Sequence, residues 1–398
     1  MDKMVIIPDS FKGTMSSKQV GKIIAQQAAS IWPDAQIIQI PVADGGEGTV
    51  DALLEVLPGR KKSVWVQGPW GDKIESFYGM CGNTALIEMA AAAGLPLTGE
   101  KRDPGKTTTF GVGQLIFAAL DAGAQTIILG LGGSATNDGG TGAATALGIR
   151  FMDAKQQPFI PVGDTLEKIQ CIDFSEVDPR LSHTEILAMC DIKNSLCGAD
   201  GAAAVFGPQK GADAQQVAKL DAGLKHLAEV IQKQRERDVL ELPGGGAAGG
   251  MGAGIAAFFD AKLVPGIETI LDLVNFDELL NGCTLVVTGE GRIDAQSSQG
   301  KVISGVVKRA KKAKVPVVAI GGDIGEGAEQ LYRLGLTAMF SINQRAIPFE
   351  IAKLCAQKDL QTTARNVFVL IHALEDKSQE ELSVSEVGDD TLNYNMYI

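Results

Sequence analysis

Short apolar runs alternate with amphipathic segments at both ends of the 398-residue chain. Residues 4–7 predict a strand, and the helical spacing of apolar side chains over about 17–31 predicts a helix with a capping box at Ser16 and Gln19. A further strand and helix then complete a βαβα start, which is typical of a parallel sheet. The same alternation returns after about residue 279, with a last helix to about Leu374 and strands over 284–287, 315–320 and 338–342.

The middle of the chain has a different pattern. Turn signals and aromatic residues over 64–82 predict short strands or hairpins, so we place a domain boundary near residue 62. The whole pattern predicts an α/β protein, in which a Rossmann- or flavodoxin-like parallel-sheet domain carries a second α/β domain inserted in it. The predicted boundaries are 1–62 with 283–378 for the first domain, 63–282 for the second, and 379–398 for a disordered acidic tail.

A glycine-rich segment, GLGGSATNDGG (130–140), follows the apolar run 126–129 and precedes a predicted helix. Five of its eleven residues are glycine. A tight turn would account for one glycine pair. Five glycines interleaved with Ser134 and Asn137 favour a loop whose backbone N–H groups bind phosphate or another anion.

Six polar or glycine-rich loops each follow a short apolar strand. Ligands of open parallel sheets bind beyond the carboxyl ends of the strands, so this set of loops predicts a cleft between the two domains. The loops are 9–13, 44–48, 132–140, 191–194, 289–294 and 321–323.

The contents of these loops indicate phosphoryl transfer. Such a site needs amides for phosphate, carboxylates for Mg²⁺ and for the acceptor hydroxyl, and cations for developing charge. Helix capping would explain Glu47 and Asp138 equally well, whereas Asp191 and Asp294 each have a cation within three positions. The candidate groups are the carboxylates of Asp9, Asp44, Glu47, Asp138, Asp191, Glu290 and Asp294, and the cations Lys12, Lys193, Arg292 and Lys301.

The composition of the chain disfavours several classes of function. A net charge of -12 disfavours nucleic-acid binding. Six cysteines without a CxxC pair predict reduced thiols in a cytoplasmic protein, and three histidines outside any glycine-rich motif make a histidine-based mechanism improbable. The sequence has no signal-peptide pattern and no apolar run of about 18 residues, so we expect no membrane span.

Two segments resemble nucleotide-binding motifs but do not match them fully. Residues 99–107 have one residue too many for a Walker A loop, and the G-x-G-x-x-G match at 244–249 does not follow a strand. A nicotinamide-dependent oxidoreductase would need a glycine fingerprint at the first strand-to-helix turn, which reads DSFKGT instead. A non-catalytic protein that binds small anions stays an alternative.

Seven motifs in order resemble the glycerate kinase type-1 family. Two positions depart from the family pattern, because Ser195 and Val302 stand where the family usually has proline. The motifs are DSFKGT (9–14), PVADGGEGT (41–49), GLGGSATNDGG (130–140), CDIKN (190–194), VFGPQKGA (205–212), GGGAAGGMGAG (244–254) and TGEGRIDAQSSQGK (288–301).

The resemblance implies two α/β domains, one inserted in the other, and an ATP- and Mg²⁺-dependent kinase of D-glycerate. Members of the family generally form 2-phosphoglycerate, although the sequence leaves 3-phosphoglycerate or another small hydroxy acid open. The expected partners are small molecules, without nucleic acid or membrane. Whether the protein is a monomer or a homodimer stays open.

Site roles follow as expectations from the motif positions. We expect Asp191 or Asp294 to hold Mg²⁺, and Asp44 or Asp191 to act as the base. Lys12 and Lys301 would stabilise charge on the transferred group. The glycine loop has no cation of its own, so we expect its cations from the other domain. The expected ATP-binding residues are Gly132, Gly133, Ser134, Asn137, Gly289 and Glu290, and those expected to bind glycerate are Asp9, Ser10 and Arg292, whose guanidinium can clamp a carboxylate.

Overall fold

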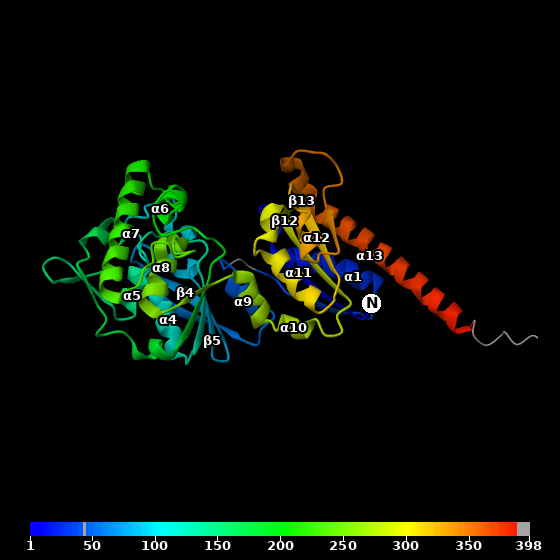
Figure 1. Cartoon of the computed structure of the whole chain (residues 1–398), viewed down its shortest axis with the longest axis horizontal. Helices are drawn as coiled ribbons and strands as arrows, with labels where there is room; N and C mark the ends of the chain where they lie inside the picture. The colour runs from blue at the N-terminus through cyan, green and yellow to red at the C-terminus, as the bar shows by residue number, and fades with distance from the viewer. Residues whose placement is uncertain (43–44, 388–398) are drawn as a thin grey trace, which may run out of the picture. The chain divides into compact units, whose positions relative to one another are not determined.

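The chain forms two compact units, one of which is built from both ends of the sequence (Figure 1). The computed structural model describes residues 1–42 and 45–387, with side chains to residue 375. The first unit comprises Met1–Pro41 and the chain from Phe276 onward, and the second comprises Val42–Asn275.

The boundaries between the units differ from the expected ones near residues 62 and 283. Strand β3 (Arg60–Gln67) pairs along its whole length with β4 (Lys73–Cys81), so a boundary at residue 62 would divide a strand of the second unit. The glycine-rich segment after residue 44 therefore belongs to the second unit, and residues 276–282 belong to the first.

A five-stranded parallel sheet forms the centre of the first unit. The strand order is β14-β13-β12-β1-β2, and each neighbouring pair is parallel, as the βαβ pattern predicts. The strands are β1 (Lys3–Pro8), β2 (Gln36–Gln39), β12 (Leu285–Ile293), β13 (Val317–Ile324) and β14 (Ala338–Ser341).

Strands β12 and β13 extend into two segments that we expected to be loops, over residues 289–293 of the first and all of 321–323. Glu290 pairs with Gly321, and Arg292 pairs with Asp323. The glycines there allow close approach rather than a turn, since a Cβ at Gly289 would lie 2.1 Å from Ile320 O. Their polar side chains are thus mounted on strands.

Helices cover this sheet, and the predicted capping box at its first helix is confirmed. In α1 (Ser17–Ile31), Ser16 Oγ accepts from the Gln19 N–H at 3.3 Å and the Ser16 N–H donates to Gln19 Oε1 at 2.9 Å. The other principal helices are α10 (Phe276–Leu279), α11 (Val302–Lys312), α12 (Gln330–Leu334) and α13 (Phe349–Val387).

Helix α13 is longer than the sequence predicts. Its N-terminal half packs against α1, where the Trp32 and Phe368 rings lie 5.6 Å apart between centroids. The backbone stays helical to Val387, so residues 379–387 form helix where we expected a disordered tail. Residues 388–398 of that predicted tail lie outside the described residues.

The second unit has a mixed six-stranded sheet in the order β11-β10-β6-β5-β4-β3. Its last four strands in chain order are mutually parallel, and β3 with β4 forms the predicted hairpin at one edge. The parallel strands are β5 (Thr84–Glu88), β6 (Thr126–Gly130), β10 (Glu185–Met189) and β11 (Lys262–Val264). Its principal helices are α2 (Thr49–Leu54), α3 (Ala90–Ala93), α4 (Phe110–Asp121), α5 (Thr141–Ala146), α6 (Ala202–Phe206), α7 (Ala214–Arg235), α8 (Ala247–Phe259) and α9 (Gly266–Leu273).

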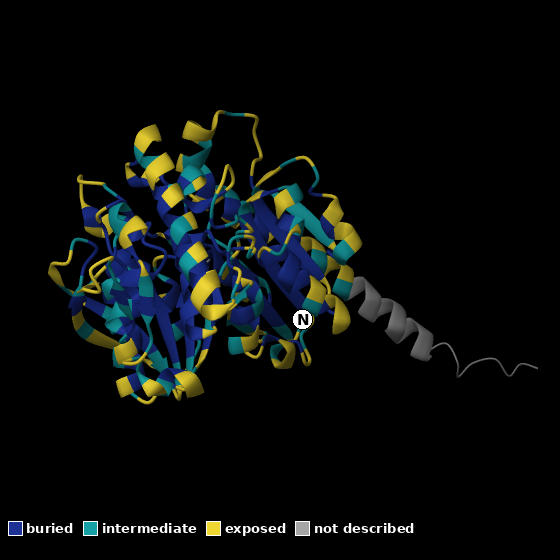
Figure 2. Cartoon of the chain, turned by 60° about the vertical axis from the view of Figure 1, so that its left-hand side comes forward, coloured by how far each residue is buried: buried dark blue, intermediate teal, exposed yellow. Residues whose placement is uncertain are grey.

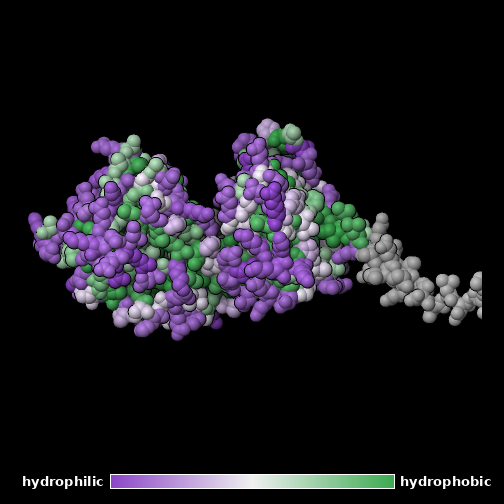
Figure 3. All heavy atoms as spheres, in the orientation of Figure 1, coloured by the Kyte–Doolittle hydropathy of each residue, from purple (hydrophilic) through white to green (hydrophobic). Residues whose placement is uncertain are grey.

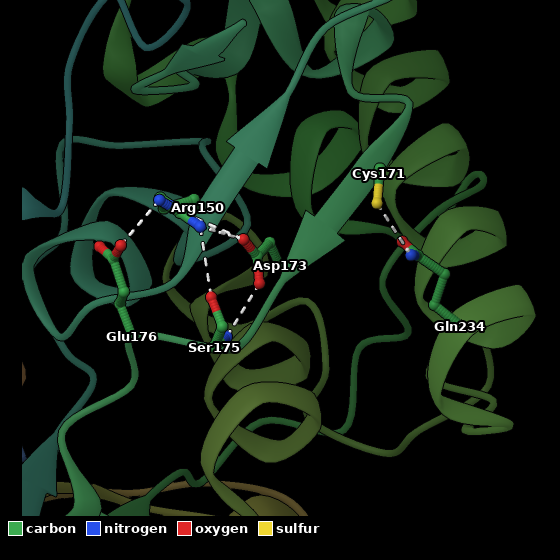
Figure 4. A network of polar contacts seen from close by, with 6 residues as sticks. All are labelled: Arg150, Cys171, Asp173, Ser175, Glu176 and Gln234. Carbon is green, nitrogen blue, oxygen red and sulfur yellow. Dashed lines mark hydrogen bonds and ion pairs between the residues drawn. The ribbon is translucent and has the colours of Figure 1, made fainter. Parts of the chain in front are cut away.

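A small three-stranded sheet, β8-β7-β9, is crossed by ion pairs and hydrogen bonds between charged side chains (Figure 4). It comprises β7 (Arg150–Met152), β8 (Pro158–Phe159) and β9 (Cys171–Asp173). Arg150 donates to Asp173 Oδ2 at 3.1 Å and to Glu176 Oε1 at 2.7 Å. The Ser175 backbone N–H and then the Arg150 guanidinium lower the pKa of Asp173 to about 2. This network links β7 to β9 and to the segment that follows β9.

Each unit has its own apolar core. Figure 2 shows buried strands under helices whose outer faces are exposed. Hydrophilic residues cover much of the face seen in Figure 3. None of the described helices is long and apolar enough to cross a membrane.

Candidate active site

The glycine loop of the second unit, residues 130–140, connects β6 to α5 and is held against a second glycine-rich segment. The Gly132 N–H donates to Gly45 O at 3.1 Å. A Cβ at Gly132 would lie 2.7 Å from Gly46 Cα, so only glycine allows this approach. Of the three amides that we expected to bind phosphate, that of Gly132 is therefore already engaged.

The next two amides of the loop are available. The carbonyl of Gly133 accepts from the Leu95 N–H at 2.9 Å, and the Ala135 N–H donates to Ala93 O at 2.8 Å. Between these bonds, the N–H groups of Gly133 and Ser134 donate to no other residue in the described part of the chain. Gly133 is exposed and has a φ of +74°. Successive N–H groups beside a left-handed residue can bind an anion, which is the role that we expected of this loop.

A buried lysine lies within the same unit, next to this loop. Lys210 ends the short 3₁₀ turn Pro208–Lys210 and is 2% exposed. Its Nζ donates to Ser134 Oγ at 2.7 Å and to Thr136 O at 2.7 Å. Burial lowers the pKa of Lys210 to about 7, against the opposing charge of Asp138. The three cations that we expected from the other domain, Lys12, Arg292 and Lys301, do lie in the first unit, and Lys210 is a further cation in the glycine loop's own unit.

Asp138 and Asn137 lie in the interior of the loop. Asp138 accepts from the N–H and hydroxyl of Thr109, both at 2.8 Å, and from the Gly140 N–H at 3.1 Å. Burial raises the pKa of Asp138 and these bonds oppose the rise. The N-cap of α5 is Gly140 rather than Asp138, and the Asp138 carboxylate instead binds donors of two loop segments. Neither side-chain polar atom of the buried Asn137 has a partner among the described residues, nor does the Thr136 hydroxyl.

Asp191 follows β10 and contacts the start of a helix. Its Oδ1 accepts from the N–H of Gly266, the first residue of α9, at 2.8 Å. The carboxylate is also exposed, so it can contact a ligand as well as stabilise the helix end. Asp44, the other expected base, lies outside the described residues.

Sequence reasoning missed Glu88, the last residue of β5. Its side chain is 1% exposed, and Oε2 accepts from the N–H groups of Thr49 at 2.8 Å and Val50 at 3.4 Å. Burial raises the pKa of Glu88. The carboxyl group thus supports the start of α2, directly after the glycine-rich segment. A single glutamate at the end of an apolar run gives no sequence signal of this role.

In the first unit, the loop 9–13 lies against β12. The Asp9 N–H donates to Gly289 O at 2.7 Å, and the Ser10 N–H donates to Asp9 Oδ1 at 2.6 Å. A Cβ at Gly291 would lie 3.1 Å from Lys12 N. The structure therefore brings Asp9, Ser10, Lys12 and Gly289 together, as expected from the ends of neighbouring parallel strands.

Glu290, on β12, is a buried carboxyl group in the same cluster. It is 5% exposed, and its Oε1 has no partner among the described residues. Burial raises the pKa of Glu290 to about 7, and the charges of Asp9 and Asp294 act in the same direction. The Ser297 hydroxyl and Lys301 oppose them. A carboxyl group with this pKa can either donate or accept a proton near neutral pH.

Arg292, Asp294 and Lys301 continue the cluster. Arg292 Nε lies 3.7 Å from Asp294 Oδ2, yet its side chain is 65% exposed and can still bind an anion. Asp294 Oδ1 accepts from the Gln296 N–H at 2.9 Å, so this carboxylate caps the turn that follows. Lys301 precedes α11, and its Nζ donates to Gln296 Oε1 at 3.2 Å.

The described residues include no group of three or more His, Cys, Asp or Glu side chains that could hold a metal ion. Mg²⁺ in phosphoryl-transfer sites is commonly bound through one or two carboxylates, phosphate oxygens and water. Asp191 and Asp294 each fit that role as a single carboxylate ligand. Either carboxylate, each in its own unit, could therefore serve as a ligand of Mg²⁺ that arrives with a nucleotide.

Comparisons with known proteins point to one enzyme family. Residues 4–372 match the glycerate kinase family. A glycerate kinase of Halalkalibacterium halodurans is 45% identical over 93% of this chain and 98% of its own length, and a glycerate 2-kinase of Escherichia coli K12 is 47% identical over 85% and 90%. A crystal structure described as a candidate glycerate kinase 2 from Salmonella typhimurium LT2 has a TM-score of 0.83 and 45% identity, and covers 94% of this chain and 99% of its own.

Proposed function

Because the chain belongs to the glycerate kinase family and is an ATP-dependent kinase, we propose that it transfers the γ-phosphoryl group of ATP to D-glycerate. We further propose 2-phosphoglycerate as the product, which the name of the Escherichia coli relative supports. The observation that carries the proposal is the pair of unengaged amides at Gly133 and Ser134 beside the buried Lys210. This arrangement suits a nucleotide phosphate.

In the proposed complex, the second unit binds phosphate through Gly133 and Ser134, with Asn137 as a further contact from the loop interior. The amide of Gly132 shapes the loop through Gly45 rather than binding ATP. Asp191 or Asp44 accepts the proton of the glycerate hydroxyl as the new O–P bond forms and the bond to ADP breaks.

The first unit supplies the substrate contacts and cations. Arg292 binds the glycerate carboxylate through its exposed guanidinium, with Asp9 and Ser10 at the hydroxyl groups. Lys12 and Lys301 stabilise negative charge on the transferred group. Gly289 and Glu290 lie beside the ATP phosphates. A protonated Glu290 can donate a hydrogen bond to a phosphate oxygen without repelling it. Bound Mg²⁺, held by Asp191 or Asp294, would neutralise part of the phosphate charge.

The proposal requires that residues from both units act on the same pair of substrates. Catalysis would then depend on the two units coming together around ATP and glycerate, with water excluded from the transferred group.

The direct test mixes the protein with ATP, Mg²⁺ and D-glycerate and follows ADP release, with a ³¹P spectrum of the product. We expect glycerate-dependent ADP and the signal of 2-phosphoglycerate. Turnover with a different hydroxy acid alone would assign the kinase to that substrate. Binding of glycerate without ADP formation would favour an anion-binding protein instead.

Asp191→Asn tests the role of this carboxylate within the same assay. Asparagine keeps an oxygen acceptor for the Gly266 N–H, so we expect the fold to survive while kcat falls by roughly 100-fold or more. The matched control is Asp200→Asn, at an exposed acid of the same unit, which should leave kcat unchanged. Near-normal turnover of the first variant would remove Asp191 from the chemistry.

A further inference from the structure

The glycine loop contains no lysine or arginine in its eleven residues, yet it has a cation of its own. Lys210 lies far from the loop in the sequence, 76 positions after Ser134 and 74 positions after Thr136. Its ammonium donates to the Ser134 hydroxyl and to the Thr136 carbonyl. Ser134 and Thr136 flank Ala135, and Ser134 also carries one of the two unengaged amides.

The loop is fixed from a second direction by the other glycine-rich segment, 244–254. The Gly139 N–H donates to Gly249 O at 3.0 Å, and a Cβ at Gly249 would lie 1.9 Å from Thr136 O. The Thr136 carbonyl is therefore confined by the Gly249 backbone and the Lys210 ammonium together. A loop held in this way presents its N–H groups in one arrangement before any ligand arrives.

Burial makes Lys210 costly if it serves packing alone. An apolar side chain would fill the space without desolvating a charge. The negative charge that raises the pKa of Lys210 is that of Asp138. The Asp138 carboxylate already accepts hydrogen bonds from Thr109, Gly140 and Gly142. Unpartnered polar atoms of Thr136 and Asn137 lie in the same loop. The Thr136 hydroxyl and the Asn137 side-chain N–H groups are donors, so together with the lysine charge they suit an anion.

We propose that Lys210 is a positioning residue for the nucleotide phosphates, which holds Ser134 and Thr136 so that the Gly133 and Ser134 amides converge on one phosphate group. This inference rests on the proposed function for the identity of the anion. The positive charge of Lys210 acts on that phosphate through the loop, where low solvent access strengthens the attraction.

The test compares Lys210→Met and Lys210→Arg with the control Lys225→Met, at an exposed lysine of the same unit. ATP binding is measured by calorimetry without glycerate, and KM is measured separately for ATP and glycerate. For Lys210→Met we expect the Kd and KM for ATP to rise about tenfold or more, with KM for glycerate within about twofold. Lys210→Arg should recover part of the loss because it keeps the charge.

A lysine that only supports the fold would behave differently. Lys210→Met would then lower Tm or the active fraction while the remaining protein kept a normal KM for ATP, and that result would overturn the proposal. If Lys210→Met does not fold, Ser134→Ala removes one acceptor of Nζ with little change in volume. An unchanged KM for ATP in that variant would also overturn it.

Failure of this inference is distinguishable from failure of the proposed function. Wild-type protein that binds ATP in a Lys210-dependent manner but forms no ADP with D-glycerate would contradict the proposed substrate and leave the positioning role intact. Normal phosphorylation of glycerate with unaltered ATP binding in Lys210→Met would contradict the positioning role alone.

Discussion

At the scale of single residues, Glu290 makes the stability of the first unit depend on pH. The unfolded chain ionises this carboxyl group near its ordinary pKa of 4.5, whereas burial holds the proton in the folded protein to about pH 7. Folding therefore binds a proton between these values. The resulting stabilisation is complete below pH 4.5 and is lost as the pH rises to about 7.

The variant Glu290→Gln should remove this dependence. We expect its free energy of unfolding, relative to wild type, to rise between pH 5 and pH 8 by up to about 3 kcal/mol, at 1.36 kcal/mol per pKa unit. Trp65→Phe and Trp70→Phe in both proteins leave Trp32 as the fluorescent reporter of the first unit. Urea unfolding at several pH values then measures the difference.

The control for this prediction is Glu326→Gln, at an exposed glutamate of the same unit. Its effect on stability should not change over the same pH range. A difference between wild type and Glu290→Gln that stays flat from pH 5 to pH 8 would show that the Glu290 pKa is not raised in the folded protein.

The positions of candidate residues could be predicted where the sequence places polar groups after apolar strands. That reasoning found Asp9, Lys12 and Ser134, which the structure places at the carboxyl ends of β1 and β6. It missed Lys210, because a lysine in the polar turn PQKG resembles any solvated lysine until long-range packing buries it. It could not foresee that Gly45 engages the Gly132 amide, since the two lie on different segments.

At the scale of elements, a glycine in the sequence can indicate either a turn or a close contact between backbones, and the two could not be told apart. The parallel βαβ pattern and the hairpin were predicted from apolar spacing, whereas β12 and β13 were expected to end before their glycines. Both strands continue because a residue without Cβ lets their backbones approach each other. Helix α8 shows the same use of glycine in a helix.

Gly254 tests that interpretation. It lies inside α8, where a Cβ would meet Gly139 O at 2.0 Å, so Gly254→Ala must displace the glycine loop or the helix. We expect a loss of about 2 kcal/mol in the free energy of unfolding and a higher KM for ATP. Chemical unfolding and steady-state kinetics measure the two effects.

The matched control is Gly21→Ala, inside α1, where the nearest atom to a new Cβ is 3.8 Å away. Helix propensity alone should then stabilise the protein by up to about 1 kcal/mol. If both alanine variants were equally stable relative to wild type, the close contact between α8 and the glycine loop would not be required for folding.

At the scale of the whole molecule, the described side chains of the C-terminal helix complete the core of the first unit. Leu360 and Phe368 are buried. Glu375 Oε2 accepts from Trp32 Nε1 at 3.0 Å, while its Oε1 lies 3.4 Å from the N-terminal amino group of Met1. The match to the family ends at residue 372, near this contact.

We therefore expect deletion of residues 376–398 to leave Tm and kcat close to those of the full chain. Deletion from residue 360 onward should lower Tm strongly or prevent folding, because it removes apolar side chains from the core. Thermal unfolding and the ADP assay on both truncated proteins provide the comparison. A large loss of activity in the shorter deletion would give the extension a role in catalysis.

The pairing of β1 with β12 has a consequence for synthesis of the chain on the ribosome. The hydroxyl of Thr288 donates to Ile7 O across 281 positions, so the N-terminal strands emerge long before their partner exists. At 5–20 residues per second that interval is roughly 15–55 s. Residues 42–275 form a contiguous unit and can pair all their strands within it. During that interval β1 and β2 present unpaired strand edges, which makes the nascent N-terminus the segment most exposed to misassociation and to chaperones.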